Sequence, residues 1–210
     1  MGLETVRKLR SPNFDPDPMY NYLETEARRL GLAQTQKALP LMKEKHEGQF
    51  RRGMTDTAPY RVHPLTLATH ALKMGIAEDD VLSALLLHDV VEDTPTKAED
   101  LPVSERVREA IRLVSWNTYP GNKQSVKPVY YANIAKNPLA SLIKCIDRCN
   151  NLSCMADGFT RTKQASYITE TENYILPLLD VIGTVPEWSD AQWLLRYQIH
   201  TLVETFKRLL

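Results

Sequence analysis

The segment LLLHDVVEDT places one histidine and three acids within a run of leucine and valine. On one continuous helix over 79–93, where each residue turns by about 100°, His88 would lie above Glu92 and Asp89 above Asp93. Leucine and valine side chains occupy the other faces of this helix, which predicts that it is enclosed by other helices. Buried carboxylates need a cation or hydrogen-bond donors, and the segment has no lysine or arginine. A bound metal ion is the simplest compensation.

Two other places in the chain offer metal ligands. His63 stands directly before Pro64, and proline at a first helical position predicts that the imidazole lies at the N-terminal edge of a helix. Asp147 is the one acid of SLIKCIDRCNNL, an otherwise apolar or basic helical run. Together with His88 and Asp89, these residues provide two imidazoles and two carboxylates. This mixed set suits Mn²⁺, Fe²⁺ or Zn²⁺ and leaves coordination positions open for water and substrate.

The elements that must position these side chains are helices, because apolar residues recur at three- and four-residue steps almost throughout the chain. We expect helices at 19–31, 35–48, 63–75, 79–93, 103–116, 125–136, 138–156, 162–183 and 188–208. The clearest apolar stripe falls on 162–183. Alternating runs typical of strands are missing, so the sequence predicts an all-α bundle. With no evident linker, we expect one domain over 1–210, whose C-terminal helices at 162–210 pack on the rest.

Composition limits the classes of function. The 210 residues include 26 basic and 26 acidic side chains, which argues against binding long nucleic acid. No run approaches the roughly 20 apolar residues of a membrane span, and the N-terminus lacks a signal-peptide core. We therefore expect a cytoplasmic protein without membrane contact. Cys145, Cys149 and Cys154 are an odd number of closely spaced cysteines, and we interpret them as small core-facing residues.

Four ordered segments carry a family resemblance: GQFRR at 48–52, PYRVHPLTLA at 59–68, ALLLHDVVEDT at 84–94 and LIKCIDRCNNL at 142–152. They resemble the hydrolase domain of Rel/SpoT-type alarmone enzymes and the stand-alone small alarmone hydrolases. These proteins belong to the all-α superfamily of HD-domain metal-dependent phosphohydrolases. The resemblance spans about Lys43 to Leu152. It implies an HD-domain helical bundle that removes the 3′-pyrophosphate of (p)ppGpp or (p)ppApp.

The resemblance also implies roles for individual residues. It implies that Mn²⁺, or another divalent transition metal, is bound by His63, His88, Asp89 and Asp147. Glu92 and Asp93 would position or deprotonate the attacking water. Arg51 and Arg52 would pack against the purine and hold phosphate, while Asn151 would reach the substrate sugar or a metal-bound phosphate.

The chain also departs from the Rel/SpoT pattern. The loop before His63 is longer, in GMTDTA, and Asn150 and Cys154 replace a histidine and a threonine. The stretch WNTYPGNKQS lacks the usual Val-Thr-Lys motif. Because the chain has no synthetase domain, the resemblance implies degradation of an alarmone and not its synthesis.

Other interpretations remain open at this stage. Glu92 and Asp93 could be solvated acids at a helix end, and Arg51 and Arg52 a solvated basic patch. The protein could be an HD phosphohydrolase for another nucleotide, or a non-catalytic HD module that senses a nucleotide. As an alarmone hydrolase it could neutralise an alarmone-making toxin, and it could form a homo-oligomer.

Overall fold

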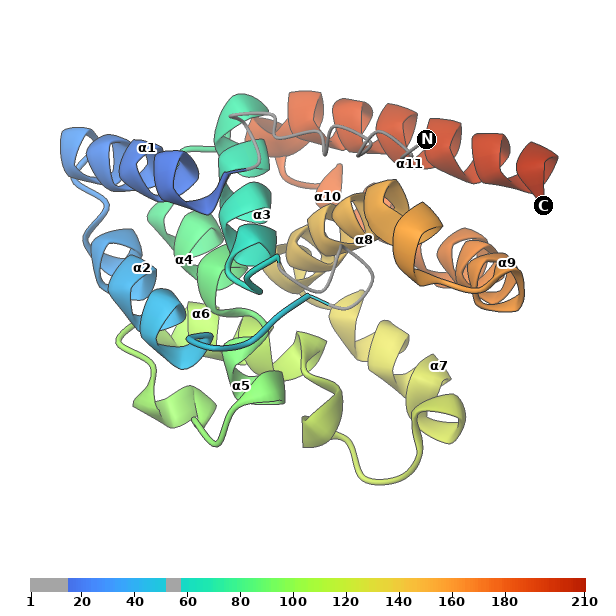
Figure 1. Ribbon diagram of the computed structural model, residues 1–210, viewed down its shortest axis with the longest axis horizontal. Helices are drawn as coiled ribbons and strands as arrows, with labels where there is room; N and C mark the ends of the chain where they lie inside the picture. The colour runs from blue at the N-terminus through green and yellow to red at the C-terminus, as the bar shows by residue number, and fades with distance from the viewer. Residues whose placement is uncertain (1–14, 52–57) are drawn as a thin grey trace, which may run out of the picture.

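The computed structural model describes residues 15–51 and 58–210, and this part of the chain folds as a bundle of α-helices (Figure 1). The all-α prediction is confirmed. Within these ranges the β-pairing is limited to an isolated bridge between Phe50 and Pro59. None of the helices described has the length and apolar character needed to cross a membrane.

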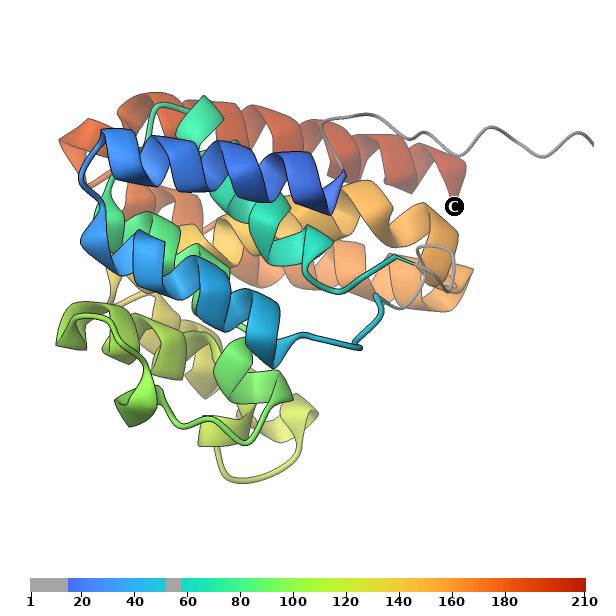
Figure 2. The same cartoon turned by 60° about the vertical axis from the view of Figure 1, so that its left-hand side comes forward.

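The N-terminal helices surround the predicted site from one side. They are α1 (Pro16–Arg29), α2 (Ala33–Lys45), α3 (Val62–Lys73) and α4 (Asp79–Leu87). The Asp79 carboxylate, in the first turn of α4, accepts hydrogen bonds from the backbone amides of Gln34 and Thr35 at 2.9 and 2.7 Å. These amides have no partner inside α2, so the contact caps α2 and joins it to α4. Figure 2 shows α1 and α2 on the outside of this part of the bundle.

The helix predicted over 79–93 is interrupted, which corrects the sequence analysis. α4 ends at Leu87, and a short helix, α5 (Val90–Asp93), follows after a turn at His88 and Asp89. The Nδ1 atom of His88 lies 2.9 Å from the carbonyl oxygen of Leu85. In a continuous helix that carbonyl would accept from the amide of Asp89, so the imidazole competes with the main chain at this point.

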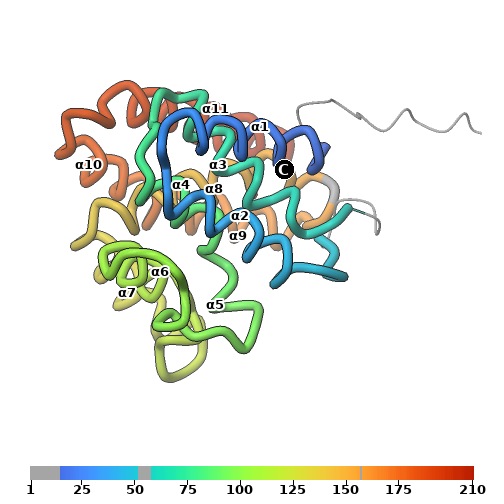
Figure 3. The backbone as a smooth tube through the Cα atoms, turned by 90° about the vertical axis from the view of Figure 1, so that its left-hand side faces the viewer, coloured from blue at the N-terminus to red at the C-terminus, as the bar shows by residue number. Residues whose placement is uncertain are grey.

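A lower part of the molecule is built from α6 (Glu105–Val114) and α7 (Lys123–Ile134), which lie together in Figure 3. Short 3₁₀ turns, η2 (Ala98–Asp100) and η3 (Trp116–Thr118), precede and follow α6. The side chains of Ser104 and Asn122 cap the N-termini of α6 and α7.

The long helix α8 (Pro138–Gly158) runs through the middle of the bundle and packs on α3, α4, α6 and α11. Its apolar face supplies Leu142, Ile143 and Ile146 to the core. Asp147 follows directly and is therefore carried into the interior. Cys145 and Cys149 are buried on this helix as expected, whereas Cys154 is half-buried.

The second correction concerns the helix predicted over 162–183. It divides into α9 (Arg161–Glu170), a π-helical turn η4 (Thr171–Ile175) and α10 (Leu178–Ile182). Pro177 has no N–H to donate and cannot continue a regular α-helix without a clash. The chain widens just before it, and the amide of Leu176 bonds to the carbonyl of Thr171 at 3.0 Å. After η5 (Pro186–Trp188), α11 (Ser189–Leu209) lies along α8 (Figures 1 and 2).

Candidate metal centre and active site

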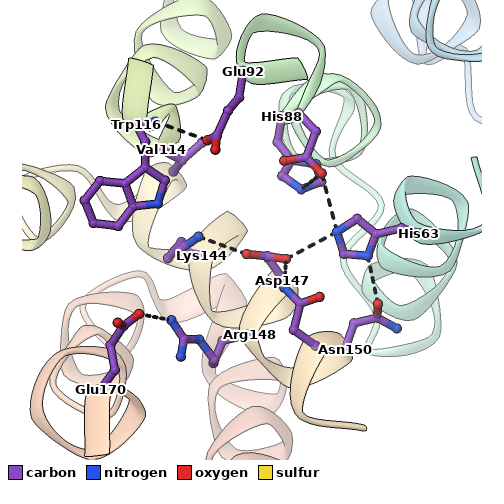
Figure 4. A network of polar contacts seen from close by, with 12 residues as sticks. His63, His88, Glu92, Val114, Trp116, Lys144, Asp147, Arg148, Asn150 and Glu170 are labelled. Atoms are coloured by element: carbon purple, nitrogen blue, oxygen red, sulfur yellow. Dashed lines mark hydrogen bonds and ion pairs between the residues drawn. The ribbon is translucent and has the colours of Figure 1, made fainter. Parts of the chain in front are cut away.

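Four of the predicted residues meet between α3, the turn after α4, and α8. One ligand atom each from His63, His88 and Asp89 lies within 4.8 Å of the others. Nε2 of His63 is 3.6 Å from Oδ2 of Asp89 and 3.3 Å from Oδ1 of Asp147. Nε2 of His88 is 3.0 Å from Oδ2 of Asp89. The imidazoles and the Asp147 carboxylate converge on one space (Figure 4).

Both imidazoles are oriented through Nδ1. Nδ1 of His63 lies 2.8 Å from Oδ1 of Asn150, and Nδ1 of His88 lies 2.9 Å from the carbonyl oxygen of Leu85. Both partners are acceptors, so Nδ1 donates in each case. In the neutral imidazoles, Nε2 then presents its lone pair to the cluster, as in a metal-ligating histidine whose other nitrogen is held by an acceptor.

The residues present fit a divalent cation. Nε2 of His88 is buried and makes no well-formed hydrogen bond, although it lies close to the Asp89 carboxylate. An unpartnered buried nitrogen beside carboxylate oxygens is costly without a cation to bind them all. The donor set of two nitrogens and carboxylate oxygens suits Mn²⁺, Fe²⁺ or Zn²⁺.

Burial and charge act in opposite directions on these groups. Burial lowers the pKa of His63 and keeps its imidazole neutral. Burial also opposes the charge of His88, but the carboxylates of Asp89 and Asp147 outweigh it and raise the pKa to about 9. Burial disfavours ionised Asp89 too, yet the attraction of His88 holds its pKa well below the usual range. The carboxylate is thus ready to bind a cation, while a proton competes with that cation for His88.

The Asp147 carboxylate is held from three sides. Nζ of Lys144 lies 2.9 Å from Oδ2, and the side-chain amide of Asn151 donates to Oδ1 at 2.5 Å. His63 faces Oδ1 as described above. Although burial opposes ionisation, Lys144 and His63 keep the pKa of Asp147 well below its usual range. Asp147 is therefore an ionised, oriented ligand candidate.

Asp89 and Asp93 both interact with Tyr60. The Tyr60 hydroxyl donates to Oδ2 of Asp89 at 2.5 Å. Asp93 lies at the exposed rim, where loss of hydration and the negative charge of Asp89 raise its pKa. An effective general base has a pKa near the operating pH, and the raised pKa of Asp93 brings it closer to that value.

Glu92 lies on α5, after the break that follows α4, so the continuous helix predicted to carry both His88 and Glu92 is interrupted between them. Its Oε2 accepts from the backbone amide of Trp116 at 3.2 Å, and its Oε1 pairs with Nζ of Lys123 at 3.2 Å. The side chain still lines the pocket of the cluster. Glu92 therefore connects the site to η3 through Trp116, as Figure 4 shows, and to the start of α7 through Lys123.

Arg51 reaches the same region from the loop after α2. Its Nη2 donates to the side-chain oxygen of Asn151 and to that of Asn150 at 3.3 Å. Asn150 thus bridges Arg51 and His63. Arg52, also predicted to contact substrate, lies outside the described residues.

Two adjoining cavities open at the site. One of about 210 Å³ contains the cluster, and its cationic lining residues are Arg51, Lys123, Lys144 and Arg148. A larger cavity of about 610 Å³ shares Arg51, Tyr60 and Asn151 with it and extends to Phe50 and Phe159. The smaller cavity, with its cationic lining, suits an anionic group, and the larger cavity has room for a larger group attached to it.

Three features of the site were not predicted from the sequence: Tyr60, Lys144 and the contact of Asn150 with His63. Lys144 stands one helical turn before Asp147, a spacing that places two side chains on one face. Tyr60 likewise precedes His63 by one turn of chain. The substitution at Asn150 was visible in the sequence, but its hydrogen bond to His63 joins two distant segments.

A helical bundle with this His-His-Asp-Asp cluster defines the HD class of hydrolase folds. None of the family models compared with the chain matches it. The chain is 32% identical over 145 residues to the human guanosine-3′,5′-bis(diphosphate) 3′-pyrophosphohydrolase MESH1, which covers 64% of this chain and 79% of the relative. The enzyme of the same name from Aquifex aeolicus is 31% identical over 161 residues, or 73% of this chain and 22% of the relative. The chain thus spans about a fifth of the length of this bacterial relative.

A solved structure shows the same fold. It is described as "A metazoan ortholog of SpoT hydrolyzes ppGpp and plays a role in starvation responses". The TM-score is 0.67 at 26% identity, over 82% of this chain and 95% of that one. The chain belongs to the Rel/SpoT-type family of guanosine-3′,5′-bis(diphosphate) 3′-pyrophosphohydrolases. The family predicted from the four sequence segments is confirmed.

Proposed function

We propose that the protein is a Mn²⁺-dependent pyrophosphohydrolase that removes the 3′-pyrophosphate of (p)ppGpp or (p)ppApp. The observation that carries this proposal is the convergence of His63, His88, Asp89 and Asp147, whose imidazole nitrogens and carboxylate oxygens face one another between the helices. The relatives named as ppGpp hydrolases support the choice of substrate class.

In this proposal the four residues hold Mn²⁺. When bound, such an ion supplies Lewis-acid chemistry that lowers the pKa of water and neutralises phosphate charge. Water attacks the phosphorus next to the ribose 3′-oxygen, and the bond between that phosphorus and oxygen breaks. The 3′-hydroxyl and pyrophosphate are released, so ppGpp and water give GDP and pyrophosphate.

Two acids of the chain act on that water: one accepts its proton and the other orients it. Asp93, whose pKa is raised by loss of hydration and by Asp89, accepts the proton. Glu92 is fixed by the Trp116 amide and Lys123 and orients the water.

The cationic lining of the smaller cavity binds the phosphates, and the larger cavity binds the nucleoside. Arg51 stands at the junction and is held by Asn150 and Asn151. Asn151 also contacts Asp147, so it connects substrate and ligand sites. A basic pair of Arg51 and Arg52 completes the proposed phosphate and purine contacts.

The test is incubation of purified protein with Mn²⁺ and separate samples of ppGpp, pppGpp, ppApp, GTP, dNTPs and nucleoside monophosphates. Chromatography identifies the products. GDP and pyrophosphate from ppGpp are expected. Turnover only at 5′-phosphates would favour another HD phosphohydrolase, and no turnover by either wild type or Asp89→Ala would favour a nucleotide-sensing module.

A cytoplasmic location, a role in the stringent response, neutralisation of an alarmone-making toxin, and self-association are further proposals. Co-expression with an alarmone synthetase tests neutralisation, because only the active hydrolase should restore growth. Sedimentation analysis tests self-association.

A further inference from the structure

Lys144 is a largely buried cation that lines the metal pocket. Its side chain is 13% exposed, and its Nζ lies 2.9 Å from Oδ2 of Asp147, one turn further along α8. Figure 4 shows the ammonium group directed at this carboxylate. A buried ammonium without a partner is costly, so the pair is a fixed feature of the interior.

The two oxygens of Asp147 have different partners. Oδ2 faces Lys144, whereas Oδ1 faces Nε2 of His63 at 3.3 Å and the amide of Asn151. Oδ1 is therefore the oxygen on the side of the imidazole cluster. The other oxygen, Oδ2, is paired with the ammonium group of Lys144.

The other paired cations lining the pocket use carboxylates outside the cluster. Lys123 pairs with Glu92 at 3.2 Å, and Arg148 pairs with Glu170 at 2.5 Å. Lys144 differs because its partner is one of the four candidate ligands. Its charge must compete with a bound cation for the same side chain.

We propose that Lys144 is a positioning residue of the metal centre. It engages Oδ2 of Asp147 so that Oδ1 alone is offered to the cation, and a coordination position stays available for water or substrate phosphate. This inference rests on the proposed function. Without Lys144, the carboxylate would be free to offer both oxygens and would lose its permanent counter-charge, so the cation would bind more tightly and turnover would fall.

Lys144→Met tests the inference against Lys127→Met. Lys127 is a matched control because it is also a poorly exposed lysine, 18% exposed, paired at 2.6 Å with Glu170 away from the cluster. Mn²⁺ titration followed by electron paramagnetic resonance should show binding to Lys144→Met tighter by on the order of tenfold. The visible spectrum of Co²⁺-loaded protein should change, and kcat should fall more than KM rises. Lys127→Met should match wild type in Mn²⁺ affinity and Co²⁺ spectrum.

Two further variants complete the experiment. Lys144→Arg keeps the charge and should retain wild-type Mn²⁺ affinity. Lys144→Gln gives the same readouts as the methionine variant if that variant does not fold. Unchanged or weaker Mn²⁺ affinity with an unchanged Co²⁺ spectrum in the neutral variants would overturn the inference while leaving the hydrolase proposal intact. Failure of wild-type protein to bind Mn²⁺ would instead contradict the proposed function.

Discussion

The side-chain oxygen of Asn150 lies 2.8 Å from Nδ1 of His63, and this contact connects the middle of α8 to the start of α3. This hydrogen bond sets which nitrogen of His63 faces the cluster. In the Rel/SpoT pattern a histidine stands at the position of Asn150, so this chain orients His63 through an amide. The contact leads to a testable statement about metal affinity.

Asn150→Ala should weaken Mn²⁺ binding by roughly 10- to 100-fold, because loss of an orienting partner frees the imidazole to rotate and change tautomer. Calorimetric titration measures the affinity. Asn133→Ala is the control, since Asn133 is a polar helix residue on α7 with its side chain bonded to the exposed Lys136. Equal Mn²⁺ affinity for wild type and Asn150→Ala would show that His63 needs no such partner.

Asp89→Ala and Asp147→Ala should each abolish metal-dependent hydrolysis together with Mn²⁺ binding. Each substitution removes a carboxylate from the cluster and leaves buried positive or unpaired groups behind. Metal content of protein purified without chelators, measured beside activity, checks both effects. Retention of stoichiometric Mn²⁺ in Asp147→Ala would remove that residue from the ligand set.

Glu92→Ala should leave Mn²⁺ bound and lower kcat by roughly 10²-fold, because the attacking water loses the carboxylate that orients it. The Glu92 carboxylate accepts from the Trp116 amide and pairs with Lys123, and neither of these partners is an imidazole of the cluster. Parallel determination of Mn²⁺ content and kcat separates the two roles. Loss of metal equal to that of Asp89→Ala would make Glu92 a ligand.

Glu170 should make stability depend on acid pH. Burial opposes its charge, but Arg148, Lys127 and Tyr131 lower its pKa from 4.5 to about 2. The unfolded chain therefore binds more protons than the folded chain between these values. The stabilisation is complete above about pH 4.5 and is lost as the pH falls towards 2.

Urea unfolding of wild type and Glu170→Gln at pH 7 and pH 3 measures this dependence. The variant should be less stable by a few kcal/mol at pH 7, and the difference should shrink at pH 3. Glu172→Gln is the control, because its ion pair with Lys207 is exposed and screened by solvent and is expected to contribute little to stability. A difference between wild type and Glu170→Gln that stays constant with pH would show that Glu170 does not carry this linkage.

The sequence was sufficient for the helical fold and for the meeting of His63, His88, Asp89 and Asp147. Those residues are visible because each is a polar group in an apolar helical run, where burial without compensation is costly. The arrangement of Glu92 was not predictable from helical period. Its partners, Trp116 and Lys123, come from a distant segment, and the helix before it is interrupted at His88, whose Nδ1 lies 2.9 Å from the carbonyl oxygen of Leu85.

Contacts between distant segments were also beyond sequence reasoning. The Tyr60 hydroxyl reaches Asp89 from a loop that is distant in the sequence. Pro177, in contrast, is a local signal from which the division of the helix over 162–183 could have been predicted. The roles of Arg51, Asn151 and the acids remain predictions, as does the single domain over 1–210. Arg52 lies outside the described residues.

A crystal grown with MnCl₂, with diffraction recorded on both sides of the manganese absorption edge, tests the central claim most directly. We predict one anomalous peak within bonding distance of Nε2 of His63, Nε2 of His88, and carboxylate oxygens of Asp89 and Asp147. A cluster without a peak at saturating Mn²⁺, or a peak bonded to neither His63 nor Asp147, would contradict the proposed metal centre.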